Sequence, residues 1–199
     1  SNGLQDMCGG MVAIGRDEHL QRIAEAQARM RELGMAAIYL NAGTNLTYFT
    51  GTKWHPSERM VGAILPASGA LEYIAPAFEE CTLQGFMQVE GAVNCWEEHE
   101  SPYQLFIDVL ARVGIAASEA APPRIGMCES APWFIADGVR KLAAGYVLDN
   151  ASAVTAFCRS RKSKAEIALM QRVKDMTLEV HKAAASILYE GITTVEVTD

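Results

Sequence analysis

The hydrophobic positions of the chain follow two different spacings. From Asp17 to Leu33 they recur every three or four residues and stop at Gly34, which predicts an amphipathic helix with a glycine cap. The apolar run from Met35 to Leu40 is too short for a helix and suits a strand buried on both faces. The runs Val61 to Leu65 and Leu71 to Ala75 flank a turn with Pro and Gly, and together they predict a β-hairpin.

Helices and strands continue to alternate along the chain as far as residue 157. The pattern predicts helices at residues 78–86, 102–113 and 132–144, and strands at residues 89–96, 124–128 and 146–148. Strands that alternate with helices, with one hairpin among them, are typical of an α/β fold. We therefore expect a three-layer domain with a mixed β-sheet flanked by helices.

The pattern changes after Phe157. Ser163 and Glu166 have the spacing of a capping box, a helical stripe runs from Ile167 to Ile187, and Gly191 is expected to cap its end. Thr193 and Glu196 repeat the capping-box spacing and predict one more helix. The expected organisation is a tag remnant (Ser1 to Gly3) and flexible N-terminus at 1–14, a domain at 15–157, a linker at 158–163 and the truncated start of a second domain at 164–199.

Composition and charge exclude several classes of function. The 17 Lys and Arg residues are outnumbered by 24 Asp and Glu residues, so the net charge of -7 argues against a nucleic-acid or anionic membrane surface. The sequence has neither a membrane-spanning apolar run nor a signal peptide pattern. The five cysteines are scattered without a C-x-x-C pair, and we expect reduced, mostly buried thiols in a cytoplasmic protein.

No catalytic or metal-ligating residue can be assigned from the sequence pattern. Hydrolase elbows and glycine-rich phosphate loops are absent from it. Glu97, Glu98, His99 and Glu100 could hold a divalent cation, but neighbouring residues rarely converge on one ion, and a solvated acidic loop is favoured. His19 and His181 lie on expected helices, where packing or surface roles are favoured.

The segment from Thr44 to Gly51 and the residues that follow it carry the most information. A short helix or turn there places aromatic residues and an arginine on a connection, where binding residues tend to lie. For Tyr48 and Phe49 a core role is favoured. Trp54 and Arg59 are either loop residues or a recognition pair for an acidic or planar ligand.

The run Asn45 to Gly51 resembles the N-x-x-Y-hydrophobic-[ST]-G signature of the amino-terminal domain of creatinase, prolidase and aminopeptidase P proteins. Arg161 to Met170 resembles the linker and first helix of their catalytic pita-bread domain, and Gly191 to Val197 is similar to the turn before its next helix. The resemblance implies a ribonuclease H-like fold. It also implies the non-catalytic N-terminal domain of a metal-dependent Xaa-Pro peptidase, a hydrolase of the M24 metallopeptidase family.

The resemblance further implies two divalent metals, manganese or cobalt, held by a catalytic domain beyond residue 199. The chain alone would then hold no cofactor and be inactive. It implies a proline-containing peptide substrate and a homodimer in which this domain reaches over the partner's active site. Arg59 stands eight residues after Gly51, where creatinase has an arginine on the substrate carboxylate, and Trp54 is a possible wall of that site. Two alternatives stay open. One is a peptide-binding module of a metal-free relative, and the other is a creatinase-like amidinohydrolase, which Ser57 in place of an aromatic residue disfavours.

Overall fold

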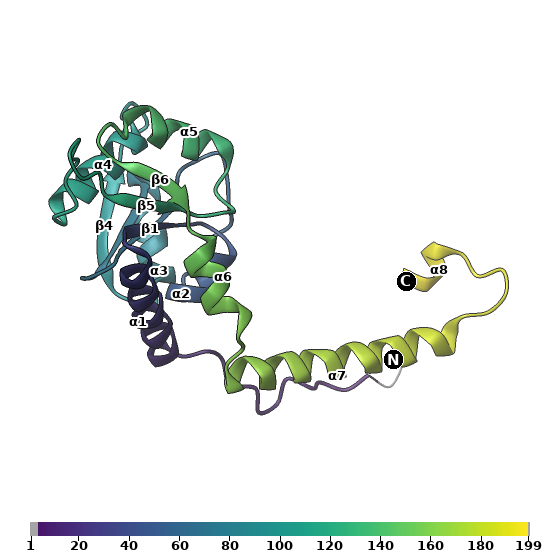
Figure 1. Ribbon diagram of the computed structural model, residues 1–199. Coiled ribbons are helices and arrows are strands. Elements are labelled where there is room, and N and C mark those ends of the chain that lie inside the picture. The colour runs from purple at the N-terminus through teal and green to yellow at the C-terminus, as the bar shows by residue number, and fades with distance from the viewer. Residues whose placement is uncertain (1–3, 199) are drawn as a thin grey trace. The chain divides into compact units, whose positions relative to one another are not determined.

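The structure, a computed structural model, describes residues 4–198 (Figure 1). The predicted tag remnant, Ser1 to Gly3, lies outside the described residues. The chain divides into two compact units, one formed by residues 15–161 and the other by the residues up to 14 together with those from 162 onwards. Each unit is described by itself below.

The unit of residues 15–161 is built on a six-stranded mixed sheet. Its strands are β1 (Met35–Asn41), β2 (Gly62–Pro66), β3 (Leu71–Pro76), β4 (Gly91–Trp96), β5 (Arg124–Met127) and β6 (Val147–Asn150). Their order across the sheet is β4-β3-β2-β1-β5-β6. The pairs β1–β2 and β2–β3 are antiparallel, and the other three neighbouring pairs are parallel. The predicted mixed sheet with one hairpin is confirmed.

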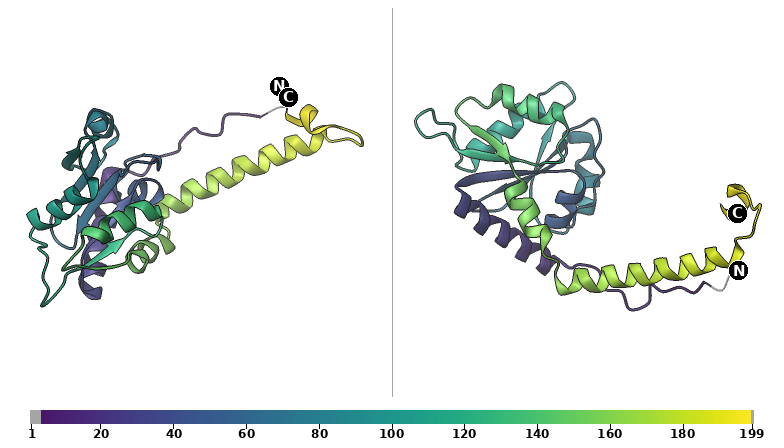
Figure 2. Two further views of the ribbon diagram at one scale, coloured as in Figure 1. Left: turned by 90° about the horizontal axis from the view of Figure 1, so that it is seen from above. Right: turned by 45° about the vertical axis from the view of Figure 1, so that its right-hand side comes forward.

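Helices cover both faces of this sheet (Figures 1 and 2). They are α1 (Arg16–Leu33), α2 (Thr44–Thr50), the 3-10 turn η1 (Ala77–Glu79), α3 (Glu80–Phe86), α4 (Pro102–Arg112), α5 (Trp133–Leu142) and α6 (Ser152–Ser160). Because side chains alternate along a strand, β1 feeds two cores. Ile38 and Leu40 belong to the core under α1, α2 and α6, whereas Ala37 and Tyr39 belong to the core under α4 and α5. The expected three layers are confirmed.

Helix α1 ends where the sequence predicts and also holds the hairpin turn. Its cap Gly34 has φ 65°, in the left-handed region that glycine adopts without strain. Gln27 Nε2 donates to the carbonyl oxygens of Pro66 at 3.0 Å and Gly69 at 2.9 Å. Arg31 Nη1 donates to the carbonyl oxygen of Ala67 at 2.7 Å. The turn between β2 and β3 is therefore fastened to α1 by side chains.

Helix α6 is an element that the sequence pattern does not predict. It runs through Ser152–Ser160, across the end of the expected domain and the first residues of the expected linker. Its burial explains its stability, since Val154, Thr155 and Cys158 all face the core. Its N-cap residue is Ala151, which has no capping side chain, and the oxygen that accepts from Ser152 N at 2.7 Å belongs to Asn150, one residue earlier. The domain boundaries themselves stay predictions.

Helix α7 (Lys164–Ile187) dominates the other unit and begins at the predicted capping box. Glu166 N donates to Ser163 Oγ at 3.1 Å, and Ser163 N donates to Glu166 Oε2 at 2.8 Å. The expected cap at Gly191 is wrong, because α7 ends in an extended residue, Leu188. Gly191 has φ 93° and lies in the loop that leads to α8 (Thr194–Thr198). At the start of α8, Glu196 N donates to Thr193 Oγ1 at 3.3 Å.

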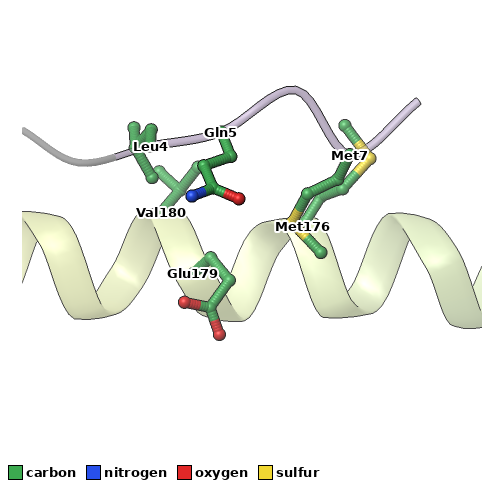
Figure 3. Close-up of a pocket in the computed structure, with 6 residues that line it drawn as sticks. All are labelled: Leu4, Gln5, Met7, Met176, Glu179 and Val180. Atoms are coloured by element: carbon green, nitrogen blue, oxygen red, sulfur yellow. The ribbon is translucent and has the colours of Figure 1, made fainter. Parts of the chain in front are cut away.

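Residues 4–14 accompany α7 within the same unit. Arg172 Nη2 lies 3.5 Å from the carbonyl oxygen of Gly9. A pocket of about 520 Å³ lies between this segment and the helix (Figure 3). Its lining residues are Leu4, Gln5, Met7, Met176, Glu179 and Val180. Leu4 and Val180 remain about half exposed, at 54% and 50%, so the segment shields the helix only in part.

Candidate functional site

A cleft of about 650 Å³ opens where β1 and β5 end at their carboxyl termini. Its volume lies in the range of about 300–1,000 Å³ that is usual for small-molecule sites. The lining combines an apolar and aromatic wall, four hydroxyl-bearing side chains and two basic side chains. These residues are Ala42, Gly43, Thr44, Thr47, Tyr48, Lys53, Trp54, His55, Pro56 and Ser130.

The short helix α2 forms one side of the cleft and is fixed at both ends by glycine. Gly43 precedes it with φ 110°, and Gly51 ends it with φ 74°. A Cβ atom at Gly51 would lie 2.7 Å from the side chain of Gln88, so the site requires glycine for space as well as for conformation. Leu46 and Phe49 anchor the helix, both fully buried. The predicted core role of Phe49 is confirmed.

Asn45, the first residue of the signature, is the centre of a polar network that sequence reasoning missed. Its Nδ2 donates to Glu129 Oε1 at 3.0 Å and lies 3.1 Å from Cys128 Sγ. Its Oδ1 accepts from Arg159 Nη1 at 2.9 Å, and Thr155 Oγ1 donates to Glu129 Oε2 at 2.9 Å. Burial alone would raise the pKa of Glu129, but these hydrogen bonds and the nearby guanidinium lower it. Glu129 is therefore ionised, and its two carboxylate oxygens accept hydrogen bonds from both α2 and α6.

Tyr48, the aromatic residue of the signature, holds α2 against two further helices. Its hydroxyl donates to the carbonyl oxygen of Cys158 in α6 at 3.0 Å. Its own carbonyl oxygen accepts from His19 Nδ1 and Arg22 Nη1, both at 2.9 Å. The Arg22 guanidinium lies 4.1 Å from the centre of the Tyr48 ring. Tyr48 is thus partly buried and structural, although one side of it lines the cleft.

His19 takes the packing role that the sequence favours. It is 4% exposed, and burial lowers its pKa, so the neutral form donates through Nδ1 to the carbonyl oxygen of Tyr48. The partners of Asn45 and Tyr48 lie between 26 and 114 residues away along the chain. A signature of seven residues marks the positions that matter, but it does not say what they contact.

Trp54 and Arg59, the two predicted site residues, lie in different surroundings. Trp54 is partly buried, lines the cleft and packs edge-on against Phe86 with ring centroids 6.2 Å apart. Arg59 is not among the lining residues. It donates from Nε to Glu98 Oε1 at 3.0 Å and from Nη2 to Glu98 Oε2 at 3.3 Å, and it also pairs with Glu58. The structure does not bring the two predicted residues together.

The pairing of Arg59 with Glu98 also shifts the pKa values of both groups. The hydrogen bond that Glu98 accepts raises the pKa of the Arg59 guanidinium and lowers the pKa of the Glu98 carboxyl. The guanidinium lies 5.3 Å from the centre of the exposed Phe78 ring. Arg59 is therefore a residue whose charge is already compensated by this chain.

Lys53 and His55 flank Trp54 at the cleft, where Lys53 supplies a positive charge and His55 an imidazole ring. Both are exposed, and neither makes a hydrogen bond or ion pair within the part of the chain that the structure describes. Of the described residues that line the cleft, none is acidic. On a chain of net charge -7, this cleft is a local basic surface. Sequence reasoning passed over both residues, although they are the direct neighbours of Trp54.

The other candidate groups give no site. Glu98 is engaged with Arg59, and Glu97 N donates to Glu100 Oε2 at 2.9 Å, as in a solvated acidic loop. Across residues 4–198, no group of three or more His, Cys, Asp or Glu side chains is placed to hold a metal ion. The expectation of mostly buried cysteines is wrong. Only Cys128 and Cys158 are buried, because Cys8 lies in the N-terminal segment and Cys81 on the outer face of α3, while Cys95 is partly buried.

Comparison with known proteins identifies the domain. The sequence model of the creatinase/prolidase N-terminal domain matches residues 22–161. The chain belongs to this family. Its signature lies on α2, so the creatinase/prolidase N-terminal domain carries its most recognisable residues at the cleft, where Asn45 and Tyr48 fix the helix.

Relatives of this creatinase/prolidase domain are peptidases. The chain is 29% identical over 117 residues to the probable dipeptidase PepE of Mycobacterium bovis, covering 57% of this chain and 31% of PepE. The crystal structure of dipeptidase PepE from Mycobacterium ulcerans matches with a TM-score of 0.76 and 25% identity, over 94% of this chain and 48% of that one. Prolidase from Thermococcus sibiricus matches with a TM-score of 0.75 and 25% identity, over 90% and 47%. The chain thus spans a third to a half of the length of these relatives.

Among the described residues, no helix combines the length and the apolar character that crossing a bilayer requires.

Proposed function

We propose that this chain is the non-catalytic N-terminal domain of a metal-dependent Xaa-Pro peptidase of the cytoplasm, of the proline dipeptidase or aminopeptidase P type. The observation that carries the proposal is the match of residues 22–161 to the creatinase/prolidase N-terminal domain, whose signature lies beside a cleft with the volume of a binding site. Its relatives named as a dipeptidase and a prolidase support a peptide as the substrate. The role of the domain is to bind and position.

The two divalent metals of this proposal, manganese or cobalt, belong to a catalytic domain outside this chain. The described residues offer no group of His, Cys, Asp or Glu that fits a metal ion, so no step through a metal is assigned to them. When bound elsewhere in the protein, such a metal pair would activate water for attack on the scissile carbonyl.

In the proposed homodimer, the cleft of one subunit contributes to the substrate entrance of the other. Trp54 forms an aromatic wall there, because it is partly exposed and backed by Phe86. Arg59, the other predicted site residue, does not line the cleft, and it would have to release Glu98 before it could hold a substrate carboxylate. Trp54→Ala in the full-length enzyme is expected to lower kcat/KM chiefly by raising KM.

The decisive test compares the full-length protein with the 199-residue chain on an Xaa-Pro dipeptide with added Mn²⁺. We expect metal-dependent cleavage by the full-length protein and none by the chain. Cleavage by the chain would place the catalytic groups within it, and an inactive full-length protein would remove the peptidase assignment. Sedimentation of the full-length protein at several concentrations tests the dimer.

A peptide-binding module without catalysis is the second candidate. It is favoured by the fact that all lining residues of the cleft, from Ala42 to Ser130, come from this one unit. A full-length protein that binds Xaa-Pro peptides without turning them over would decide for this second function.

A further inference from the structure

Arg59 and Lys53 both carry a positive charge, but only Arg59 has that charge paired within this chain. The Nε and Nη2 edge of Arg59, the fork that grips a carboxylate with two hydrogen bonds, is already filled by the two oxygens of Glu98. Lys53 and His55 have no such partner within residues 4–198. A new anion therefore meets no competing carboxylate at Lys53 and His55, whereas at Arg59 it must displace one.

The position of the two free basic side chains defines what they can recognise. They stand on either side of Trp54 along the chain, and all three residues line the cleft. The wall also has an apolar part, with Ala42 and Pro56. Its neutral polar part is made of hydroxyl-bearing residues, which are Thr44, Thr47, Tyr48 and Ser130. A complementary ligand has one anionic end and an apolar body of a few residues.

We infer that the cleft binds the free C-terminal carboxylate of a short peptide through Lys53 and His55, with the apolar end of the peptide against Trp54. The inference deepens the proposed peptidase role and rests on it, because that role makes a peptide the occupant. It assigns carboxylate recognition to residues other than Arg59. Arg59 is then a positioning residue that fixes the loop between Trp54 and β2 to Glu98.

The expected affinity is modest, since exposed ion pairs contribute little and are screened by salt. Loss of the Lys53 ammonium or of the His55 ring donor should each weaken carboxylate binding about two- to fivefold, and loss of both about tenfold. The contact with Trp54 should persist in high salt, because apolar contact is not screened.

The experiment titrates the 199-residue chain with acetyl-Leu-Pro and with its C-terminal amide, which differ only in the carboxylate. Amide NMR signals of residues 42–55 and 130 report the binding, and the acid is expected to bind at least threefold more tightly than the amide at low salt. Lys53→Met and His55→Gln should each reduce that preference. Lys174→Met removes one exposed charge from α7 and is the matched control. Arg59→Met should leave the preference unchanged.

Three results would overturn the inference. They are equal binding of acid and amide, absence of binding by both, and loss of the preference in Arg59→Met but not in Lys53→Met. The thermal unfolding of each variant shows that it is folded. If the full-length protein is inactive but the 199-residue chain still binds acetyl-Leu-Pro more tightly than its amide, only the proposed function is contradicted. If the full-length protein is active but the 199-residue chain binds the acid and the amide equally well, only the inference is contradicted.

Discussion

Helices α1 and α7 carry the same kind of apolar stripe, but only α1 buries it. In α1 the stripe residues Ile23, Ala26 and Met30 lie in the core. Among the described residues of α7 none is buried, and Met170 and Val173 are 56% and 53% exposed. Amphipathic spacing thus predicts a helix and the face that needs a partner, but the stability of the helix depends on whether that partner is there.

At the N-termini the order is reversed, because α7 has the stronger local capping and α1 has none from a side chain. Gly15 precedes α1 and no side chain caps it, whereas Ser163 and Glu166 form a complete capping box at α7. Tertiary packing therefore holds α1, and local hydrogen bonds hold the start of α7. Substitutions in the two helices should separate these two sources of stability.

The largest difference is expected from matched methionines. Met30→Ala leaves a cavity in a fully buried site and should lower the free energy of unfolding by about 2–5 kcal/mol. Met170→Ala removes exposed surface and should change it by less than about 0.5 kcal/mol. Urea unfolding of the chain, followed by circular dichroism, measures both. Equal losses from the two substitutions would show that α7 is packed in solution.

The capping box gives the next largest effect. Ser163→Ala removes the oxygen that accepts from Glu166 N and should destabilise the first turn of α7 by about 1 kcal/mol. Faster hydrogen exchange at residues 164–168, with unchanged exchange in α1, is the expected result. Thr177→Ala, in the middle of the same helix, is the control, since Thr177 bonds only back to Val173. Unchanged exchange in Ser163→Ala would mean that something else holds this end.

The hydroxyl of Tyr48 tests whether polar contacts add to the packing around α1. Tyr48→Phe keeps the ring under Arg22 but removes the bond to the carbonyl oxygen of Cys158, at an expected loss of about 0.5–1.5 kcal/mol. Exchange should rise at α6 more than at α1. A uniform rise over the whole sheet unit would contradict a local fastening of α6.

The smallest effect is a pH dependence that belongs to α1. Burial lowers the pKa of His19, so between pH 7.5 and 5.5 the unfolded chain takes up a proton that the folded chain resists. The free energy of unfolding should therefore fall on acidification. His19→Asn, which can keep a donor near the Nδ1 position, should flatten that slope. An unaltered slope in His19→Asn would exclude His19 as its source.

These contrasts show which parts of the fold can be predicted from the sequence. Local signals were enough for α1 with its cap Gly34, for the hairpin and for the capping box of α7. Helix α6 escaped prediction because its stability comes from buried contacts and not from a start signal. The position of Gly191 was predicted wrongly, because glycines with positive φ occur in loops as well as at the ends of helices.

The candidate site was predictable only in part, for a related reason. Trp54 could be placed on a connection after the first strand, and the structure puts it in the cleft. Arg59 and its partner Glu98 are 39 residues apart along the chain, and the hydrogen bond from Arg159 to Asn45 spans 114 residues. A single sequence contains no signal for such pairs, so it cannot tell a free cation from an occupied one.

The hairpin turn held by Gln27 and Arg31 has a practical consequence for protein engineering. An exposed turn between two strands is the usual place to graft a peptide tag or an epitope. Here three backbone carbonyls of the turn accept hydrogen bonds from α1. An insertion there would break hydrogen bonds to α1, whose other face packs in the core. A peptide grafted into this turn would therefore destabilise the domain.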